Sequence, residues 1–238
     1  MLFNSIAFVL FFISVLSGIS IYKKRIFQYS LLLFASYFFL YYSSNYLVIL
    51  LIFSTVWDFY LAKKIYQSKN IKYKKFLLIL SLAGNLGLLG LFKYYDFAIT
   101  QFNILGNYFD LATSIPLLNL VLPIGISFYT FQTISYTIDV YRGHLTPSKS
   151  FFEFALFVAF FPQLVAGPII RASHFLPQLR EKLSEFETGT RLRQIIIQNS
   201  NLKLGITIMA IGFFKKMFFA DNIAPVANEI FSNPYGLE

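Results

Sequence analysis

Five residues recur at helical spacing along one apolar stretch of this sequence and form a polar face. They are Gly125, Tyr129, Gln132, Tyr136 and Asp139. Because an α-helix turns about 100° per residue, they share one side over roughly 21 Å. Hydrocarbon cannot hydrogen-bond an amide, phenols or a carboxylate, so this face is predicted to look into protein or a water-filled cavity, where it could handle a substrate. The alternative is hydrogen bonding that only packs helices together.

The elements that must position this face have the composition of a membrane protein, because 57% of residues are hydrophobic and only 13% are charged. Seven apolar stretches approach the ~20 residues needed to cross the hydrocarbon core. They cover residues 2–21, 27–43, 46–62, 76–97, 118–140, 151–170 and 202–220. We therefore predict an all-α polytopic membrane protein with about six to seven hydrophobic helical segments and the lipid bilayer as its first partner.

Basic residues beside these stretches predict the orientation. Lysine and arginine cluster at 23–25 and at 63–75, whereas the connection around Asn45 carries no charge. By the positive-inside rule the basic connections are cytoplasmic and the N-terminus lies outside. The net charge of +9 follows from this topology, so no nucleic-acid partner is predicted. With no cysteine in the chain, disulfides, thiolate metal sites and catalytic thiols are excluded.

The stretch 151–170 is predicted to be broken or re-entrant. Pro162, Gly167 and Pro168 interrupt helical hydrogen bonding within it. A complete crossing would also place the 171–203 connection outside, although it carries six basic residues against three glutamates, which the positive-inside rule disfavours. A proline-kinked ordinary span is the alternative.

The connection at 171–201 is predicted to be a cytoplasmic amphipathic helix lying in the membrane interface. Leu176, Leu179 and Leu183 recur at near-helical spacing among charged residues, the pattern of an interfacial helix. A surface connector without a function of its own is the alternative.

Four ordered runs resemble the membrane-bound O-acyltransferase family, of the alginate O-acetylase and D-alanyl-lipoteichoic-acid type. They are LPIGISFYTFQTISYTIDVYRG, FFPQLVAGPIIR at 160–171, GLFKYYDF at 90–97 and GFFKKMFFADN at 212–222. The resemblance implies a larger ring of transmembrane helices around a central funnel. An acyl donor such as acetyl-CoA or another acyl thioester would enter from the cytoplasmic side, with no bound cofactor. The acyl group, expected to be acetyl, would pass to hydroxyls of an exported polysaccharide or cell-envelope polymer such as alginate.

The resemblance does not bring a catalytic residue with it. Members of the family are longer, and the histidine regarded as catalytic lies in a later stretch that contains tryptophan and histidine. This chain has one tryptophan, Trp57, and two histidines, His144 and His174. A neutral imidazole can accept the proton of a sugar hydroxyl, but both histidines lie in polar connections outside the matching runs and are interpreted as ordinary loop residues. No metal site is predicted, because two distant histidines do not form a coordination shell.

We therefore interpret residues 1–238 as the N-terminal transmembrane portion of an O-acyltransferase, inactive alone and completed by a C-terminal half. The resemblance assigns the polar face to a substrate tunnel. The broken element would be shaped by Gln163, Gly167, Pro168 and Arg171. Arg171 would hold an anionic part of the donor at the cytoplasmic mouth, unless it serves only topology. Lys216 is predicted to face the interior, paired with Asp221 only if the helix end unwinds.

The expected location is the bacterial plasma membrane, crossed several times, beside exported-glycan machinery or periplasmic acetylation partners. Two other classes of protein share some of these features. A transporter or flippase also has polar intramembrane faces and broken helices, but it should show an internal repeat, which the sequence lacks. A non-catalytic membrane scaffold would use the polar face for packing alone.

Overall fold

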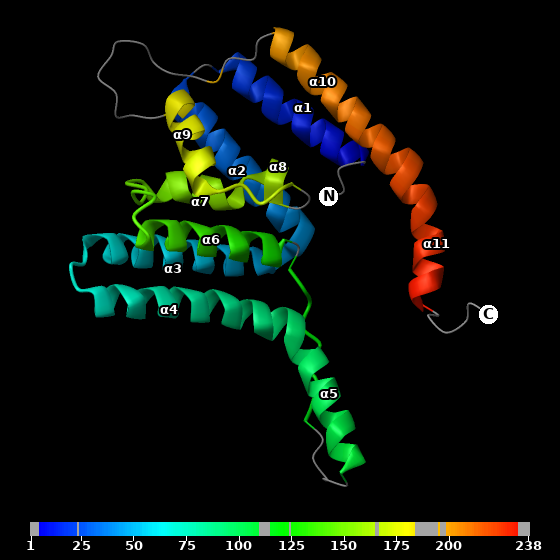
Figure 1. The fold of residues 1–238 in the computed structure, drawn as a ribbon. Helices are drawn as coiled ribbons and strands as arrows, with labels where there is room; N and C mark the ends of the chain where they lie inside the picture. The colour runs from blue at the N-terminus through cyan, green and yellow to red at the C-terminus, as the bar shows by residue number, and fades with distance from the viewer. Residues whose placement is uncertain are drawn as a thin grey trace. The chain divides into compact units, whose positions relative to one another are not determined.

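The computed structural model describes residues 5–22, 24–109, 115–123, 125–164, 167–183, 195 and 199–232 (Figure 1). Every regular element in these ranges is a helix, which confirms the all-α prediction. The chain divides into two compact units. The larger unit holds Lys24–Gln194, and the smaller one holds Leu2–Lys23 with Ile195–Glu238.

The larger unit contains eight α-helices and a π-helical turn, η2, in its described residues. They are α2 (Arg25–Ser44), α3 (Val48–Gln67), α4 (Ile71–Leu89), η2 (Gly90–Tyr94), α5 (Tyr95–Tyr108), α6 (Ile126–Tyr141), α7 (Phe151–Ala159), α8 (Phe161–Leu164) and α9 (Ala172–Leu183). A short 3-10 turn, Asn45–Leu47, joins α2 to α3. Asn70 begins α4 by accepting hydrogen bonds from the backbone N–H groups of Lys72 (2.9 Å) and Tyr73 (3.3 Å), which satisfies donors that the helix itself leaves open.

The centre of this unit is a group of three helices, α3, α4 and α6, each packed against the other two, which lie side by side in Figure 1. Aromatic and aliphatic side chains fill the space between them and α7, including Phe59, Ile65, Tyr136, Phe154 and Phe157. The α7 helix also packs against α2. The predicted polar face therefore lies on a helix that neighbours surround.

Two helical stretches in the described residues, Arg25–Gln67 and Ile71–Tyr108, are long and apolar enough to cross a membrane. The helix at Ile6–Ile21 is apolar but shorter. The predicted stretch 118–140 is helical only from Ile126 onward. The backbone before it is held against α5, because the N–H groups of Leu118 and Asn119 donate to the carboxylate of Asp96 at 2.8 and 3.0 Å.

The stretch 151–170 is interrupted. The α7 helix ends at Ala159, and Phe160 with ψ 106° separates it from the four-residue α8. The N–H groups of Gln163 and Leu164 then donate to the carbonyl of Phe160. The segment is therefore two short helices joined by a bend, and not one membrane-length helix. Part of the predicted 171–201 connector, residues 184–194 and 196–198, lies outside the described residues.

The smaller unit contains α1 (Ile6–Ile21), α10 (Asn199–Phe214), a π-helical segment η3 (Lys215–Ala220) and α11 (Asp221–Ser232). Ser5 caps α1 by accepting from the N–H of Phe8 at 3.2 Å. The η3 segment widens the helix, which brings Lys216 Nζ within 2.7 Å of Asp221 Oδ2. The pair thus forms across five residues through π-helical geometry, without the unwinding that the sequence analysis required.

Candidate functional site

The central residues of the predicted polar face are brought together on one buried side of α6. Tyr129, Gln132 and Tyr136 are 3%, 4% and 0% exposed. Gly125 lies one residue before the helix, in a left-handed conformation with φ 81°, so it begins α6 instead of contributing to its face. Asp139 is partly exposed near the other end, and its carbonyl accepts from the N–H groups of His144 and Leu145.

The amide of Gln132 binds the interrupted segment. Its Nε2 donates to the carbonyl oxygen of Phe157 at 2.8 Å, and Nε2 of Gln163 donates to the same oxygen at 2.9 Å. In an uninterrupted α-helix the N–H of Phe161 would donate to this carbonyl. It donates to Ser36 Oγ instead, at 3.3 Å. The bend after α7 therefore leaves the Phe157 carbonyl open to two side-chain amides, and we call this arrangement the Phe157 junction.

One acceptor at the Phe157 junction has no hydrogen-bond partner in the part of the chain that the structure describes. Gln163 is 7% exposed, yet its Oε1 forms no hydrogen bond within the described part of the chain. A buried polar atom without a partner is costly and calls for an explanation. A hydroxyl donor supplied from elsewhere would satisfy it.

Two glycines allow the close packing around this junction. A Cβ on Gly167 would lie 2.6 Å from Gln163 Cα, and a Cβ on Gly125 would lie 2.9 Å from the carbonyl oxygen of Leu164. Distances this short force the backbone to shift. The predicted residues Gln163 and Gly167 therefore lie together, as the broken-element interpretation expects.

The far end of the polar face connects to the loop after α6. The phenol oxygen of Tyr136 accepts from the N–H of Ser148 at 2.9 Å, and its ring packs 4.3 Å from that of Phe154. The Ser148 hydroxyl in turn donates to the carboxylate of Glu153. Glu153 also pairs with Arg180 of α9, with Nε and Oε1 2.5 Å apart. The α6, α7 and α9 helices are thus linked through one chain of polar groups.

Other predicted residues lie on exposed backbone away from this face. Pro168, Arg171, His144 and His174 are all exposed. The Arg171 carbonyl accepts from the N–H groups of His174 and Phe175 and so begins α9. Lys216 belongs to the smaller unit, where its side chain is 48% exposed. Among the described residues, no group of three or more His, Cys, Asp and Glu could hold a metal ion.

A second buried polar group was not predicted. We call it the Asp58 cluster, and its members come from α3, α4 and α6: Ser54, Asp58, Ser81, Asn85, Thr133 and Thr137. Asp58 accepts from Ser81 Oγ (2.5 Å) and Asn85 Nδ2 (2.7 Å). Asn85 Oδ1 accepts from Ser54 Oγ at 2.7 Å. A carboxylate inside the apolar stretch 46–62 was the available signal, since such residues are rare in membrane helices.

The threonines of α6 complete the Asp58 cluster. Thr137 Oγ1 donates to Asp58 Oδ1 and Thr133 Oγ1 donates to Asn85 Oδ1, both at 3.2 Å. These residues follow Tyr136 and Gln132 by one position each, so they lie about 100° around the helix from the predicted polar face. The α6 helix thus carries two polar faces, one toward α3 and α4 and one toward the interrupted segment.

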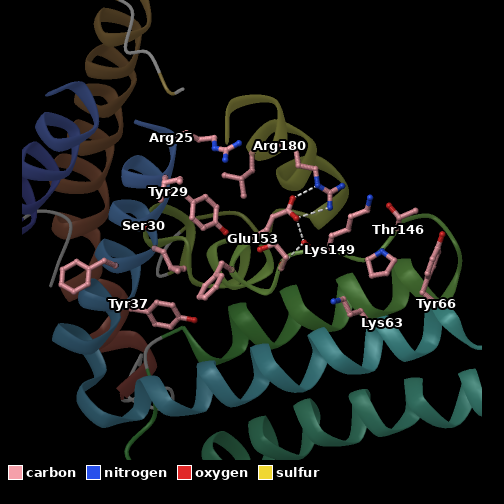
Figure 2. Close-up of a pocket in the computed structure, with 18 of the residues that line it drawn as sticks. Arg25, Tyr29, Ser30, Tyr37, Lys63, Tyr66, Thr146, Lys149, Glu153 and Arg180 are labelled. Carbon is pink, nitrogen blue, oxygen red and sulfur yellow. Dashed lines mark hydrogen bonds and ion pairs between the residues drawn. The ribbon is translucent and has the colours of Figure 1, made fainter. Parts of the chain in front are cut away.

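A cavity of about 1140 Å³ lies beside α2, α3, α7 and α9 (Figure 2). We call it the basic pocket, because four of its described lining residues are basic: Arg25, Lys63, Lys149 and Arg180. Among the same described residues Glu153 is acidic, and Tyr29, Tyr37 and Tyr66 contribute aromatic rings. None of the described residues that line it belongs to the predicted polar face or to the segment 160–171.

Comparisons with known proteins agree with the motif resemblance. Residues 142–238 match the model of MBOAT, the membrane-bound O-acyltransferase family. The peptidoglycan O-acetyltransferase of Helicobacter pylori is 36% identical over 83% of this chain and 39% of its own length. Proteins named "Probable alginate O-acetylase AlgI" from Pseudomonas putida and Pseudomonas aeruginosa are each 34% identical over 98% of this chain, and over 45% and 42% of their own lengths. The chain thus spans less than half the length of these relatives, and no solved structure matches it.

Proposed function

Because this chain belongs to the membrane-bound O-acyltransferase family, we propose that it forms part of an enzyme that transfers an acyl group, expected to be acetyl, to hydroxyl groups of an exported polysaccharide or cell-envelope polymer. One relative is named for peptidoglycan and others for alginate. Both acceptors are envelope or exported polymers that contain sugars, which supports this acceptor class and leaves the individual polymer open.

The observation that carries the proposal is the Phe157 junction. Gln132 and Gln163 donate to one carbonyl through their two amide groups, and Gln163 Oε1, which has no hydrogen-bond partner among the described residues, can accept from a hydroxyl. A sugar hydroxyl is such a donor. We assign Gln132 and Gln163 to positioning the acceptor in a tunnel that Tyr129 and Tyr136 also line. The amides orient the hydroxyl, and they are not themselves bases.

The reaction needs a base that these groups do not supply. As the acceptor oxygen attacks the thioester carbonyl, the new C–O ester bond forms, the C–S bond breaks, the hydroxyl proton passes to the base and the thiolate leaves. An imidazole with a pKa near neutrality suits this step. His144 and His174 are exposed, whereas Gln132 and Gln163 of the Phe157 junction are buried. We assign the base to a C-terminal portion of the enzyme, corresponding to the part of the relatives that this chain does not match.

The donor side is assigned to the cytoplasmic face. Acetyl-CoA or another acyl thioester carries its charge outside the acyl group, so its anionic part can remain in water while the thioester enters the bilayer. Arg171 follows the interrupted segment directly and is exposed, which supports a role at the donor mouth.

In the assembled enzyme, Arg171→Gln is expected to raise the KM for the donor about tenfold with little change in kcat, as loss of uniform binding does.

The finer membrane arrangement is also part of the proposal. It comprises six to seven hydrophobic segments in a larger helix ring, with the N-terminus outside and a re-entrant 151–170 segment. The protein would lie in the bacterial plasma membrane, beside glycan-export or periplasmic acetylation partners.

Single cysteines can be placed in this cysteine-free chain at Ser5, Asn70 and Thr146. Thr146 is chosen because it is exposed, whereas the nearby Ser148 is fully buried. Ser5 should label from outside and the other two only after permeabilisation, and the reverse pattern would overturn the orientation.

The enzymatic proposal is tested by reconstitution. Membranes that contain this chain together with a C-terminal portion of the family would receive acetyl-CoA labelled in its acetyl group, and base-labile acetate on the isolated glycan would be counted. We expect label on the glycan only when both portions are present. Absence of label in the complete system would overturn the proposed activity. Label with the 238-residue chain alone would retain the activity but refute its dependence on a second portion.

A further inference from the structure

The basic pocket lies at the ends of helices that the charge pattern predicts to be cytoplasmic. Arg25 begins α2, Lys63 lies in the last turns of α3, and Lys149 lies in the loop between α6 and α7. Arg180 of α9 reaches the same space, where it pairs with Glu153. Figure 2 shows these side chains converging from four separate segments. Among the described residues that line the cavity, four are cations and one is a carboxylate, and this excess of positive charge suits a phosphate group.

An apolar groove continues from this pocket between α2 and α3. The groove has a volume of about 320 Å³ and is lined by Phe34, Tyr37, Phe38, Tyr41, Val48 and Ile52. Phe34 and Tyr37 line both cavities. The two cavities are therefore adjacent, with basic side chains at one end and apolar side chains at the other. Phe34 and Phe38 are 69% and 42% exposed on a helix apolar enough to lie in a membrane. The groove therefore opens along an exposed apolar side of its unit.

We propose that the basic pocket and this groove together bind an anionic phospholipid of the cytoplasmic leaflet. The phosphate of the headgroup lies among Arg25, Lys63 and Lys149, and one acyl chain lies along Phe34 and Ile52. Basic pockets between membrane helices on the cytoplasmic side are suited to anionic headgroups. Tyr29, whose buried hydroxyl has no hydrogen-bond partner among the described residues, lines the pocket and can donate to a headgroup oxygen.

An anionic phospholipid and an acyl-CoA both carry phosphate and an acyl chain, so either could in principle bind a basic pocket beside an apolar groove. The residues that line the two cavities favour the phospholipid. An acetyl group is too short to fill the apolar groove. In addition, no described residue of the Phe157 junction lines either cavity. Phe154 and Phe157, both completely buried in α7, face the core, whereas Glu153 faces the pocket. A ligand in this pocket is thus outside the proposed tunnel, and it would stabilise the arrangement of α2, α3, α7 and α9.

The test uses the purified full chain, delipidated in detergent, with binding followed by native mass spectrometry. The probes are palmitoyl-oleoyl phosphatidylglycerol, phosphatidylethanolamine with the same chains, and acetyl-CoA as a soluble phosphate source. We expect the anionic lipid to bind about tenfold or more tightly than the zwitterionic one, because each nearby cation favours an anionic headgroup. Acetyl-CoA should not displace it. Equal binding of the two lipids, or displacement by acetyl-CoA, would overturn the assignment.

Matched variants locate the site. The triple variant Arg25→Gln, Lys63→Gln and Lys149→Gln should lose about tenfold or more in affinity for phosphatidylglycerol. The control Lys72→Gln, Lys74→Gln and Lys75→Gln removes the same charge from residues that do not line the pocket, and should change affinity by less than about twofold. Equal losses in both variants would show non-specific attraction and refute the site.

A second pair of variants tests the groove without changing charge or the core. Ile52 lines the groove and is 39% exposed, whereas Ile49 on the same helix is 64% exposed and does not line it. Ile52→Trp should weaken binding of the long-chain lipid about threefold or more by filling the groove, and leave binding of dihexanoyl phosphatidylglycerol unchanged. Ile49→Trp should affect neither lipid. If Ile52→Trp binds the long-chain lipid like the unmodified chain, no acyl chain occupies the groove.

Discussion

The Asp58 cluster and the Phe157 junction are both buried, both contact α6 and both contain an amide, yet their hydrogen bonding differs. In the Asp58 cluster, Ser81, Asn85 and Thr137 donate to the Asp58 carboxylate, and two further hydroxyls donate to Asn85 Oδ1. At the Phe157 junction, two amides share one carbonyl, and no residue in the described ranges donates to Gln163 Oε1. One group satisfies its acceptors internally, and the other leaves an acceptor for an outside donor.

The difference indicates separate roles for two sides of one helix. A fully satisfied buried polar network orients the helices that contribute to it and has nothing left to offer a ligand. Thr133 and Thr137 therefore secure α6 against α3 and α4. The adjacent Gln132 and Tyr136 present the other side of α6 to the interrupted segment. We infer that stability depends mostly on the first group and acyl transfer on the second, and the following variants test that division.

The largest effect is expected from Asp58→Leu. It removes the acceptor of three buried donors, which should lower the free energy of unfolding by about 3 kcal/mol or more. Heating followed by size-exclusion chromatography measures the loss. Asp58→Asn keeps the shape and one acceptor, so it should cost less, and the exchange Asp58→Asn with Asn85→Asp should recover part of the loss. If Asp58→Leu is as stable as the unmodified chain, the Asp58 cluster has no structural role.

A somewhat smaller effect is expected from Gly167→Ala. The added Cβ would lie 2.6 Å from Gln163 Cα and 2.9 Å from its carbonyl oxygen, so the Phe157 junction must shift, at a cost of about 1–3 kcal/mol. Gly87→Ala is the matched control in α4, where nothing lies within 4 Å of the new atom. It should be neutral or stabilise by up to about 1 kcal/mol. The same melting assay compares them, and equal melting temperatures would contradict the tight packing at Gly167.

Gln132→Leu should separate function from stability. In the complete enzyme, acyl transfer per folded molecule should fall about tenfold, or about 1.4 kcal/mol of transition-state stabilisation. The stability loss should be only about 0.6 kcal/mol, a typical value for one side-chain hydrogen bond in a membrane. Gln101→Leu, at an exposed site in α5, is the control for the substitution. Unchanged specific activity in Gln132→Leu would remove this residue from the tunnel.

The smallest effect is expected at a polar pair outside both groups. Lys216 and Asp221 form an ion pair in which both side chains are 48% exposed. Exposed ion pairs contribute little, so a double-mutant cycle with Lys216→Met and Asp221→Asn should give a coupling of about 0.5 kcal/mol. A coupling several times larger would show that Lys216 is buried in the assembled protein, as the sequence analysis predicts.

Much of the local structure could be predicted from sequence. Most of the apolar stretches form helices, and the spacing of Tyr129, Gln132 and Tyr136 places them on one side of α6. The two prolines and the glycine of 160–168 indicated an interruption in the segment that bends after α7. Each of these depends on residues close together in the chain. The four motif runs also predicted the family, which the relatives confirm.

The ends of these elements were less predictable. The α6 helix begins at Ile126 and not at 118, since the backbone before it is fastened to Asp96 on α5. Similarly, π-helical turns at Gly90–Tyr94 and Lys215–Ala220 lie in two of the family-like runs. Hydrophobic periodicity does not distinguish such turns from an α-helix, because these segments are apolar on every side of the helix and so show no periodic pattern.

The sequence by itself determined which segments are apolar and helical, which side of α6 carries amides and phenols, and where the chain must bend, because hydropathy, periodicity and proline geometry act over a few neighbouring residues. Only the tertiary structure decided which donor meets which acceptor. Thr137 reaches Asp58 across 79 positions of the chain, and the basic pocket gathers Arg25, Lys63, Lys149 and Arg180 from four separate segments. Such encounters depend on how helices pack, and no local pattern specifies that packing.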